Sequence, residues 1–212
     1  MGAFLVNFHC RSESPQSVAQ VLVDQGFDRV WMAGPVNGWV SFWEEQASLQ
    51  DTGRIQDIAE AVSRSLETPV IAFLVHDSDF MCYWLYDFGQ VQDEFHSYPE
   101  FFEDSVSSEA LTGDPYVLQR YCQPETSIPQ LQAILVQGSQ LEMLSGGEMS
   151  YVFAEERISG LAPLLGVNED WARTDFNDIG SDVTPEELGA HWIGSDAPDD
   201  LGESFWEMDE DE

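Results

Sequence analysis

The residues best placed to perform chemistry are four consecutive polar ones, His76-Asp77-Ser78-Asp79, which follow an apolar run. An imidazole and two carboxylates so close together could bind a divalent metal through His76, Asp77 and Asp79, or carry out acid–base catalysis. The same residues also suit a hairpin turn, in which Asp77 and Ser78 accept hydrogen bonds from backbone amides. If the strand extends through them, His76 and Asp77 point to opposite faces. The turn is therefore the favoured interpretation, and the catalytic or metal site is the alternative.

The three cysteines, Cys10, Cys82 and Cys122, are far apart and form no C-x-x-C pair. This pattern is typical of buried thiols in a reducing compartment, not of a disulfide framework or a zinc knuckle. His9 adjoins Cys10, and with His76 or Cys82 it could form a zinc site or a thiolate–imidazole pair. Adjacent strand residues face opposite ways, however. We therefore interpret Cys10 as a core residue.

Aromatic side chains recur on neighbouring predicted strands, where they could line a recognition surface. Each strand has two faces, so some of these rings must lie away from the face that helices cover. Rings on an open face, framed by Asp and Glu, would suit a protein partner, and packing in the core is the alternative. The candidate binding residues on these strands are Trp39, Trp43, Trp84 and Tyr86.

Several common enzyme classes lack their characteristic residues. The chain contains no lysine, which argues against a P-loop, a Schiff-base enzyme and a kinase, because each uses an ammonium group that arginine does not replace. No Gly-x-Ser-x-Gly motif presents a serine nucleophile, and no G-x-G-x-x-G follows a predicted strand. We therefore expect no cofactor, and we lean toward a protein that is not an enzyme.

The charge is the strongest compositional signal: 40 acidic residues stand against seven arginines, for a net charge of −33. Such a field repels nucleic acid and anionic membranes and attracts basic partners. We therefore expect no nucleic-acid or membrane partner. Three explanations for the acidity remain open: a solubilising or salt-adapted surface, a surface complementary to a basic protein, and cation binding.

Neither a membrane span nor an export signal is expected. No run approaches the roughly 18 apolar residues that a membrane-spanning helix requires. The first residues, MGAFLVNFHCRSES, lack a basic region and a small-residue cleavage site. A cytoplasmic protein is the expectation.

Hydrophobic periodicity predicts the elements that position these residues. Residues 3–10 alternate as a strand, and Ser14 before Pro15 predicts the start of a helix. Residues 29–32 and 39–43 predict a hairpin.

The central segment continues this pattern. Apolar residues at helical spacing between 55 and 66 predict an amphipathic helix. The apolar run 70–75 predicts a central strand, and residues 81–86 and 91–95 predict two more.

The predicted fold class is therefore α+β. We expect an antiparallel or mixed sheet with helices mainly on one face, of the ferredoxin-like βαββαβ kind, elaborated by extra strands. A further helix is predicted near 148–165, and a capping box at Thr184–Glu187 predicts a short helix carrying Leu188, Trp192 and Ile193. Residues 1–194 are expected to form a single domain.

The segment 195–212 is expected to be an acidic C-terminal tail, disordered or loosely docked, because nine of its eighteen residues are acidic. Phe205 and Trp206 lie between acidic residues, as in short docking motifs, so they complete the candidate binding residues. Docking of these rings back onto the domain is the alternative.

Two stretches resemble a set of uncharacterised bacterial proteins. Residues 74–102 contain a strand ending in V-H-D, a Y-W-L-Y strand and a D-E-F strand, and residues 164–179 begin with L-L-G-V. The resemblance implies a bacterial, one-domain globular protein, and it carries over no catalytic residue.

The leading functional hypothesis is a non-enzymatic acidic protein that binds a basic protein partner, as an inhibitor, immunity protein or regulator. The first alternative is a small metal-dependent or acid–base enzyme that uses the turn from His76 to Asp79. The second is acidity that serves solubility or salt adaptation alone. The sequence leaves the oligomeric state open.

Overall fold

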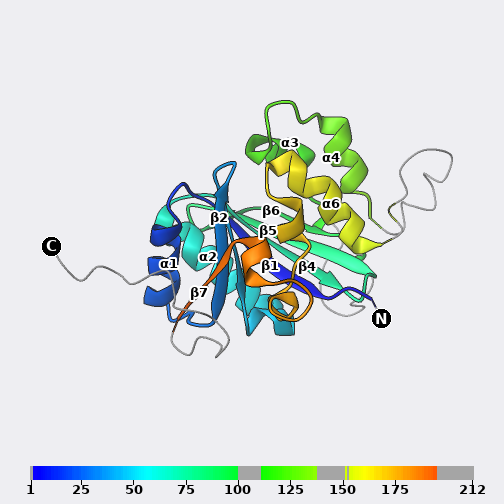
Figure 1. Cartoon of the computed structure of the whole chain (residues 1–212). Coiled ribbons are helices and arrows are strands. Elements are labelled where there is room, and N and C mark those ends of the chain that lie inside the picture. The colour runs from blue at the N-terminus through cyan, green and yellow to red at the C-terminus, as the bar shows by residue number, and fades with distance from the viewer. Residues whose placement is uncertain (1, 100–110, 138–150, 152, 195–212) are drawn as a thin grey trace.

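A seven-stranded antiparallel sheet forms the centre of the computed structural model, which describes residues 2–99, 111–137, 151 and 153–194 (Figure 1). The strand order is β6-β5-β4-β1-β3-β2-β7, and every neighbouring pair is antiparallel. The strands are β1 (Leu5–Arg11), β2 (Val30–Val36), β3 (Trp39–Glu44), β4 (Val70–His76), β5 (Phe80–Asp87), β6 (Gln90–His96) and β7 (Ala190–Ile193).

The central strands are buried on both faces, which explains their almost unbroken apolar sequences. Strand β4 shows this most clearly, since Val70, Ala72 and Leu74 belong to one core cluster while Ile71 and Phe73 belong to another. Successive side chains of a strand point to opposite sides of the sheet. A continuous apolar run therefore requires a covering layer on each side.

Helices α1 (Pro15–Asp24) and α2 (Thr52–Leu66) cover the first face (Figure 1). The predicted cap of α1 is confirmed, because the Ser14 side chain accepts a hydrogen bond from the backbone amide of Ser17. Asp51 caps α2 in the same manner, through the amides of Gly53 and Arg54. The periodic apolar residues of α2 are buried, as predicted: Ile55, Ile58, Ala59 and Val62.

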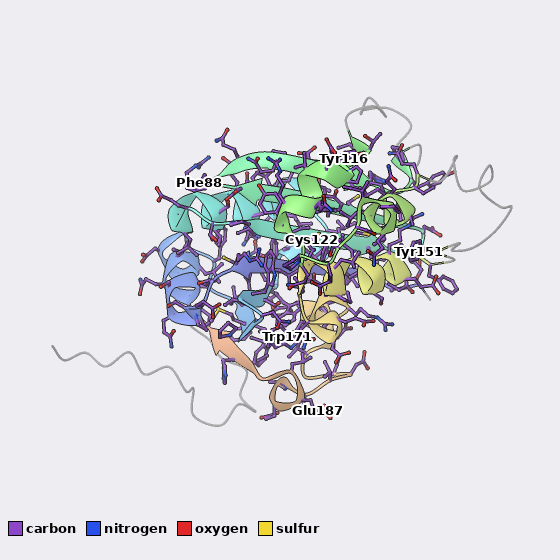
Figure 2. The ribbon with its side chains drawn as sticks, turned by 90° about the horizontal axis from the view of Figure 1, so that it is seen from above. Phe88, Tyr116, Cys122, Tyr151, Trp171 and Glu187 are labelled. Carbon is purple, nitrogen blue, oxygen red and sulfur yellow. The ribbon has the colours of Figure 1, made fainter. Side chains whose placement is uncertain are left out.

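The later part of the chain covers the second face (Figure 1). Its helices are α3 (Pro115–Leu118), α4 (Ile128–Ile134), α6 (Ala154–Leu165), α7 (Glu169–Ala172) and α8 (Pro185–Leu188). Its short 3-10 turns are η4 (Gln119–Tyr121) and η5 (Phe176–Asp178). Another 3-10 turn, η1 (Ala47–Leu49), precedes α2. Figure 2 shows Cys122 among the side chains on this side, with Phe88 and Tyr116 at the edge of the molecule.

The mixed α+β class is confirmed, but the expectation of helices mainly on one face is not. The physical reason is the pair of apolar faces on β4, which one helical layer cannot cover. The second layer comes from residues whose pattern is weak, because α3, α7 and α8 have only four residues each.

The last described elements, α8 and β7, also differ from the prediction. The capping box at Thr184 begins α8 as expected, but the helix ends at Leu188, because Gly189 adopts a positive φ of 64°. Trp192 and Ile193 then lie on β7, which pairs with β2. No helix in the described part of the chain is both long and apolar enough to cross a bilayer.

Candidate functional site

A pocket of about 720 Å³ opens on the first face of the sheet, beside the N-terminal end of α2. This volume falls within the range of small-ligand sites. The side chains around it come from the sheet, from the segment before α2 and from α2 itself; they are Leu49, Gln50, Asp51, Thr52, Gln56, Leu74, His76, Phe80, Cys82, Trp84, Glu94, His96 and Leu111.

Strand register places the floor residues of this pocket side by side. His76 lies opposite Phe80, Cys82 lies opposite His96, and Trp84 lies opposite Glu94. Directly opposed residues of an antiparallel pair project to the same face. Strands β4, β5 and β6 therefore form a continuous floor of aromatic rings, two of them histidines, with one carboxylate.

His76 is held in a defined orientation. Its Nδ1 lies 2.6 Å from Oε1 of Gln50, whose amide nitrogen donates to the carbonyl oxygen of Val75 at 2.7 Å. Because the amide nitrogen is committed to that carbonyl, Oε1 is the acceptor and His76 Nδ1 carries the proton. The ring also stacks on Phe80, with centroids 5.2 Å apart.

His96 stacks on the same phenyl ring, with centroids 4.7 Å apart. Its Nδ1 accepts a hydrogen bond of 3.1 Å from the backbone amide of Tyr98. An accepting Nδ1 carries no proton, so His96 is neutral with its proton on Nε2. The floor thus contains the stack His76, Phe80, His96, with the two imidazoles protonated on different nitrogens.

The electrostatic character of this region is acidic. Burial raises the pKa of Glu94. Burial, followed by the nearby carboxylates of Glu94, Glu60 and Asp57, raises the pKa of Tyr86 to about 12. The carboxylate of Asp51 stands at the rim, where its Oδ1 caps α2. An apolar and aromatic floor beside carboxylates is suited to an organic cation.

The structure separates the three residues of the predicted metal or acid–base site. His76 lines the pocket on the first face, whereas Asp77 and Asp79 line a second, shallow pocket with Gly2, Ala3, Ser78, Phe153 and Glu155. Asp77 and Ser78 both have positive φ, and their side chains accept hydrogen bonds from the amides of Gly2 and Ala3. Among the described residues, no three His, Cys, Asp or Glu side chains group to hold a metal ion. The tetrad is a turn.

The aromatic candidates divide between the two faces. Trp39 and Trp43 are fully buried on the second face, where their indole nitrogens donate to the carbonyl oxygens of Leu165 and Thr174. They are core residues and form no open recognition surface, because residues 165–174 cover them. Trp84 is 7% exposed and lines the pocket, and Tyr86 packs in the core cluster beside α2. Phe205 and Trp206 lie outside the described residues.

The cysteines are all free. Cys10 and Cys82 are buried, as expected, and Cys122 is half-buried. Burial raises the pKa of the Cys82 thiol, although this residue borders the pocket. A thiol of raised pKa is a poor nucleophile.

A buried polar relay is the feature that sequence reasoning missed. Asn7, His9 and Ser41 are each fully buried on the second face. The Asn7 amide nitrogen donates to the carbonyl oxygens of Ala172 and Thr174, at 2.9 and 3.0 Å. Its Oδ1 therefore accepts from His9 Nε2 at 2.9 Å, and His9 Nδ1 accepts from the Ser41 hydroxyl at 2.7 Å.

This order, serine to imidazole to amide, is that of a nucleophile, a base and an orienting group. All three side chains are inaccessible to a substrate, however, and burial lowers the pKa of His9 to about 3. The relay satisfies polar groups beneath the covering segment and ties that segment to β1. Alternation with the apolar Phe8 and Cys10 was the only sequence signal for it.

Comparison with protein-family models, with curated proteins and with solved structures finds no match for this chain.

Proposed function

We propose that this chain is a non-enzymatic acidic protein that binds a basic protein partner, as an inhibitor, immunity protein or regulator. The observation that carries the proposal is the net charge of −33, which a partner of opposite charge would offset. A cytoplasmic bacterial protein acting on a protein target fits this charge, because the same field repels nucleic acid and anionic lipid.

The disposition of the arginines supports the proposal. Arg29, Arg54 and Arg64 form ion pairs with glutamates of the chain itself. Arg157 is buried and donates to the carbonyl oxygen of Ile134, and Arg11 lies over the ring of Trp39. Five of the seven arginines thus interact within the molecule, and the three ion pairs place their positive charges beside glutamates.

We also propose that the first four strands and the two helices on the first face form a ferredoxin-like core. Residues 5–76 run in the order βαββαβ, with strands ordered β4-β1-β3-β2 and both α1 and α2 on one side. This arrangement supports a ferredoxin-like core, elaborated by β5 and β6 at one edge and by β7 at the other. The candidate pocket would then lie at the junction between that core and its elaboration.

The proposal is tested by affinity purification from the host with the full chain as bait, at low and moderate salt. A basic protein should be retained in stoichiometric amount, bind the purified chain again, and be released as salt rises, because exposed charges are screened. An unrelated protein of equal net charge is the control bait. If both baits retain the same proteins, the acidity acts only as a general surface property and the proposal fails.

A further inference from the structure

We infer that the pocket bordered by His76, Trp84 and Glu94 receives an arginine side chain of the basic partner. This inference rests on the proposed function and gives it a location. The pocket is large enough for one such side chain. An arginine combines an apolar stem and a planar group with a positive charge. The apolar and aromatic lining of the pocket suits the first, and its carboxylate suits the second.

The floor offers apolar and aromatic surface to the stem and head of an arginine side chain. Phe80 is stacked between the imidazoles of His76 and His96, so its own faces are occupied. Trp84, which lies four residues further along β5 and also lines the pocket, is the ring offered to a guanidinium group. Guanidinium groups stack on aromatic faces more readily than the compact ammonium of lysine does. Leu74 and Cys82 add apolar surface for the methylene groups.

Glu94 supplies the charge. Asp51, which also lines the pocket, is engaged in capping α2, whereas Glu94 stands opposite Trp84 on the edge strand of the sheet. A carboxylate beside an aromatic ring can accept two parallel hydrogen bonds from a guanidinium that stacks on the ring. Since burial disfavours the lone carboxylate here, a cation that neutralises it would be bound more strongly than at an exposed site.

The rim indicates a protein rather than a free small molecule as the source of the cation. Leu49 stands at the mouth of the pocket and is 80% exposed, although it is a large apolar residue. A free amine or guanidinium compound inside the pocket would leave Leu49 in water. A polypeptide crossing the mouth would cover it, as anchor residues surrounded by a covering rim do in protein interfaces.

The test uses the full chain and three peptides: acetylated and amidated tri-arginine, tri-lysine and tri-citrulline. Two-dimensional NMR of the tryptophan indole N–H groups reports the site, with the Trp84 signal assigned from a Trp84→Phe variant. Tri-arginine should shift the Trp84 signal and bind more tightly than tri-lysine, which carries the same charge. Tri-citrulline, which has the same shape without the charge, should not bind.

The variant Glu94→Gln should weaken tri-arginine binding about tenfold, because it removes the charged acceptor. Its matched control is Asp79→Asn, which changes the net charge equally but lies in the second pocket. That control should change the dissociation constant less than about twofold. Thermal unfolding of both variants checks that each is folded.

Two results would overturn the inference. If both cationic peptides bind but the two variants weaken binding equally and the Trp84 signal does not move, binding is spread over the acidic surface; the proposed function then survives without the pocket. If neither peptide binds at low salt, the pocket has no affinity for arginine, and the proposed function is decided by the partner experiment alone.

Discussion

The hydroxyl of Ser41 on β3 donates a hydrogen bond of 2.7 Å to Nδ1 of His9 on β1, in the fully buried layer beneath residues 172–175. The imidazole is neutral there, because Nδ1 is an acceptor and the side chain is fully buried. Such a group stabilises the fold only while it remains unprotonated. The relay therefore makes the stability of the domain sensitive to acid.

The first prediction concerns this sensitivity. Burial lowers the pKa of His9 from 6.5 to about 3 in the folded protein. Between these values the unfolded chain binds a proton that the folded chain does not, so the free energy of unfolding should fall as the pH falls from 6.5 toward 3. One such group contributes a slope of up to about 1.4 kcal/mol per pH unit. Urea unfolding between pH 7 and pH 4 measures it.

The variant His9→Gln should be less stable at pH 7 and should show a shallower acid slope than the wild type. The matched control is His191→Gln, at an exposed position of β7, which should keep the wild-type slope. An unchanged slope in His9→Gln would contradict a neutral buried imidazole. Asp93 changes the free energy of unfolding with pH in the opposite direction. Its contribution is the same in the variant and in the wild type, so the difference between their slopes reports His9 alone.

Asp93 gives the second prediction. Its carboxylate accepts a hydrogen bond of 2.5 Å from the Tyr83 hydroxyl and is also bonded by the backbone amide of Asp114, yet burial raises its pKa to about 6. A raised carboxyl pKa means that the folded state binds the extra proton between pH 3.8 and 6, so this group contributes less stability as the pH rises through that window.

The variant Tyr83→Phe should therefore cost more stability at pH 8 than at pH 4.5, because a bond to an ionised acceptor is stronger than one to a neutral acid. The expected loss at pH 8 is about 1.5–3 kcal/mol. Chemical denaturation at the two pH values measures the difference. Equal losses at both would mean that Asp93 does not change its protonation state between them.

The third prediction separates a buried ion pair from an exposed one. Glu44 is 2% exposed and receives Nη2 of Arg54 at 2.5 Å, Nε of Arg54 at 3.0 Å and the amide of Ala47 at 2.7 Å. The variant Arg54→Ala leaves this carboxylate buried with one donor, and should lower the free energy of unfolding by about 2–3 kcal/mol.

Arg64→Ala is the matched control, because Arg64 pairs with Glu60 on the exposed side of α2. It should change stability by no more than about 0.5 kcal/mol. Denaturation of both variants in the same buffer, at low and at high salt, gives the comparison. Similar decreases in the free energy of unfolding for the two variants would show that the burial of Glu44 does not strengthen its ion pair with Arg54.

The first half of the fold could be predicted because its local signals agree with its packing. Ser14 and Pro15 begin α1, and the apolar residues of α2 recur at helical spacing and lie on the sheet. The second half could not be predicted in the same way. Its helices are short and are held by contacts with residues more than a hundred positions away, such as the bond from Trp39 to Leu165. Such contacts leave no local pattern.

The candidate site shows the same limit. The sequence shows that the tetrad at His76 is polar, but alternation along one strand does not show which residues of other strands stand beside it. The register between β5 and β6 brings Glu94 to Trp84, and both residues line the pocket beside the start of α2. Tryptophan is common in interfaces, which favours Trp39 and Trp43 as interface residues in the sequence, yet their indole groups are buried and donate hydrogen bonds within the core.

The last prediction follows from this division of the tryptophans. Trp43→Phe removes the donor to the Thr174 carbonyl oxygen, which keeps a second bond from the Asn7 amide. The variant should lose about 1–3 kcal/mol of stability through the lost bond and the space left behind, while its dissociation constant for tri-arginine stays within about twofold of the wild type. Trp84→Phe should weaken that binding, because it reduces the aromatic floor of the pocket. Thermal unfolding and calorimetric titration of both variants measure the two effects separately. Weaker peptide binding by Trp43→Phe than by Trp84→Phe would place the recognition surface on the second face of the sheet and contradict a pocket at Trp84.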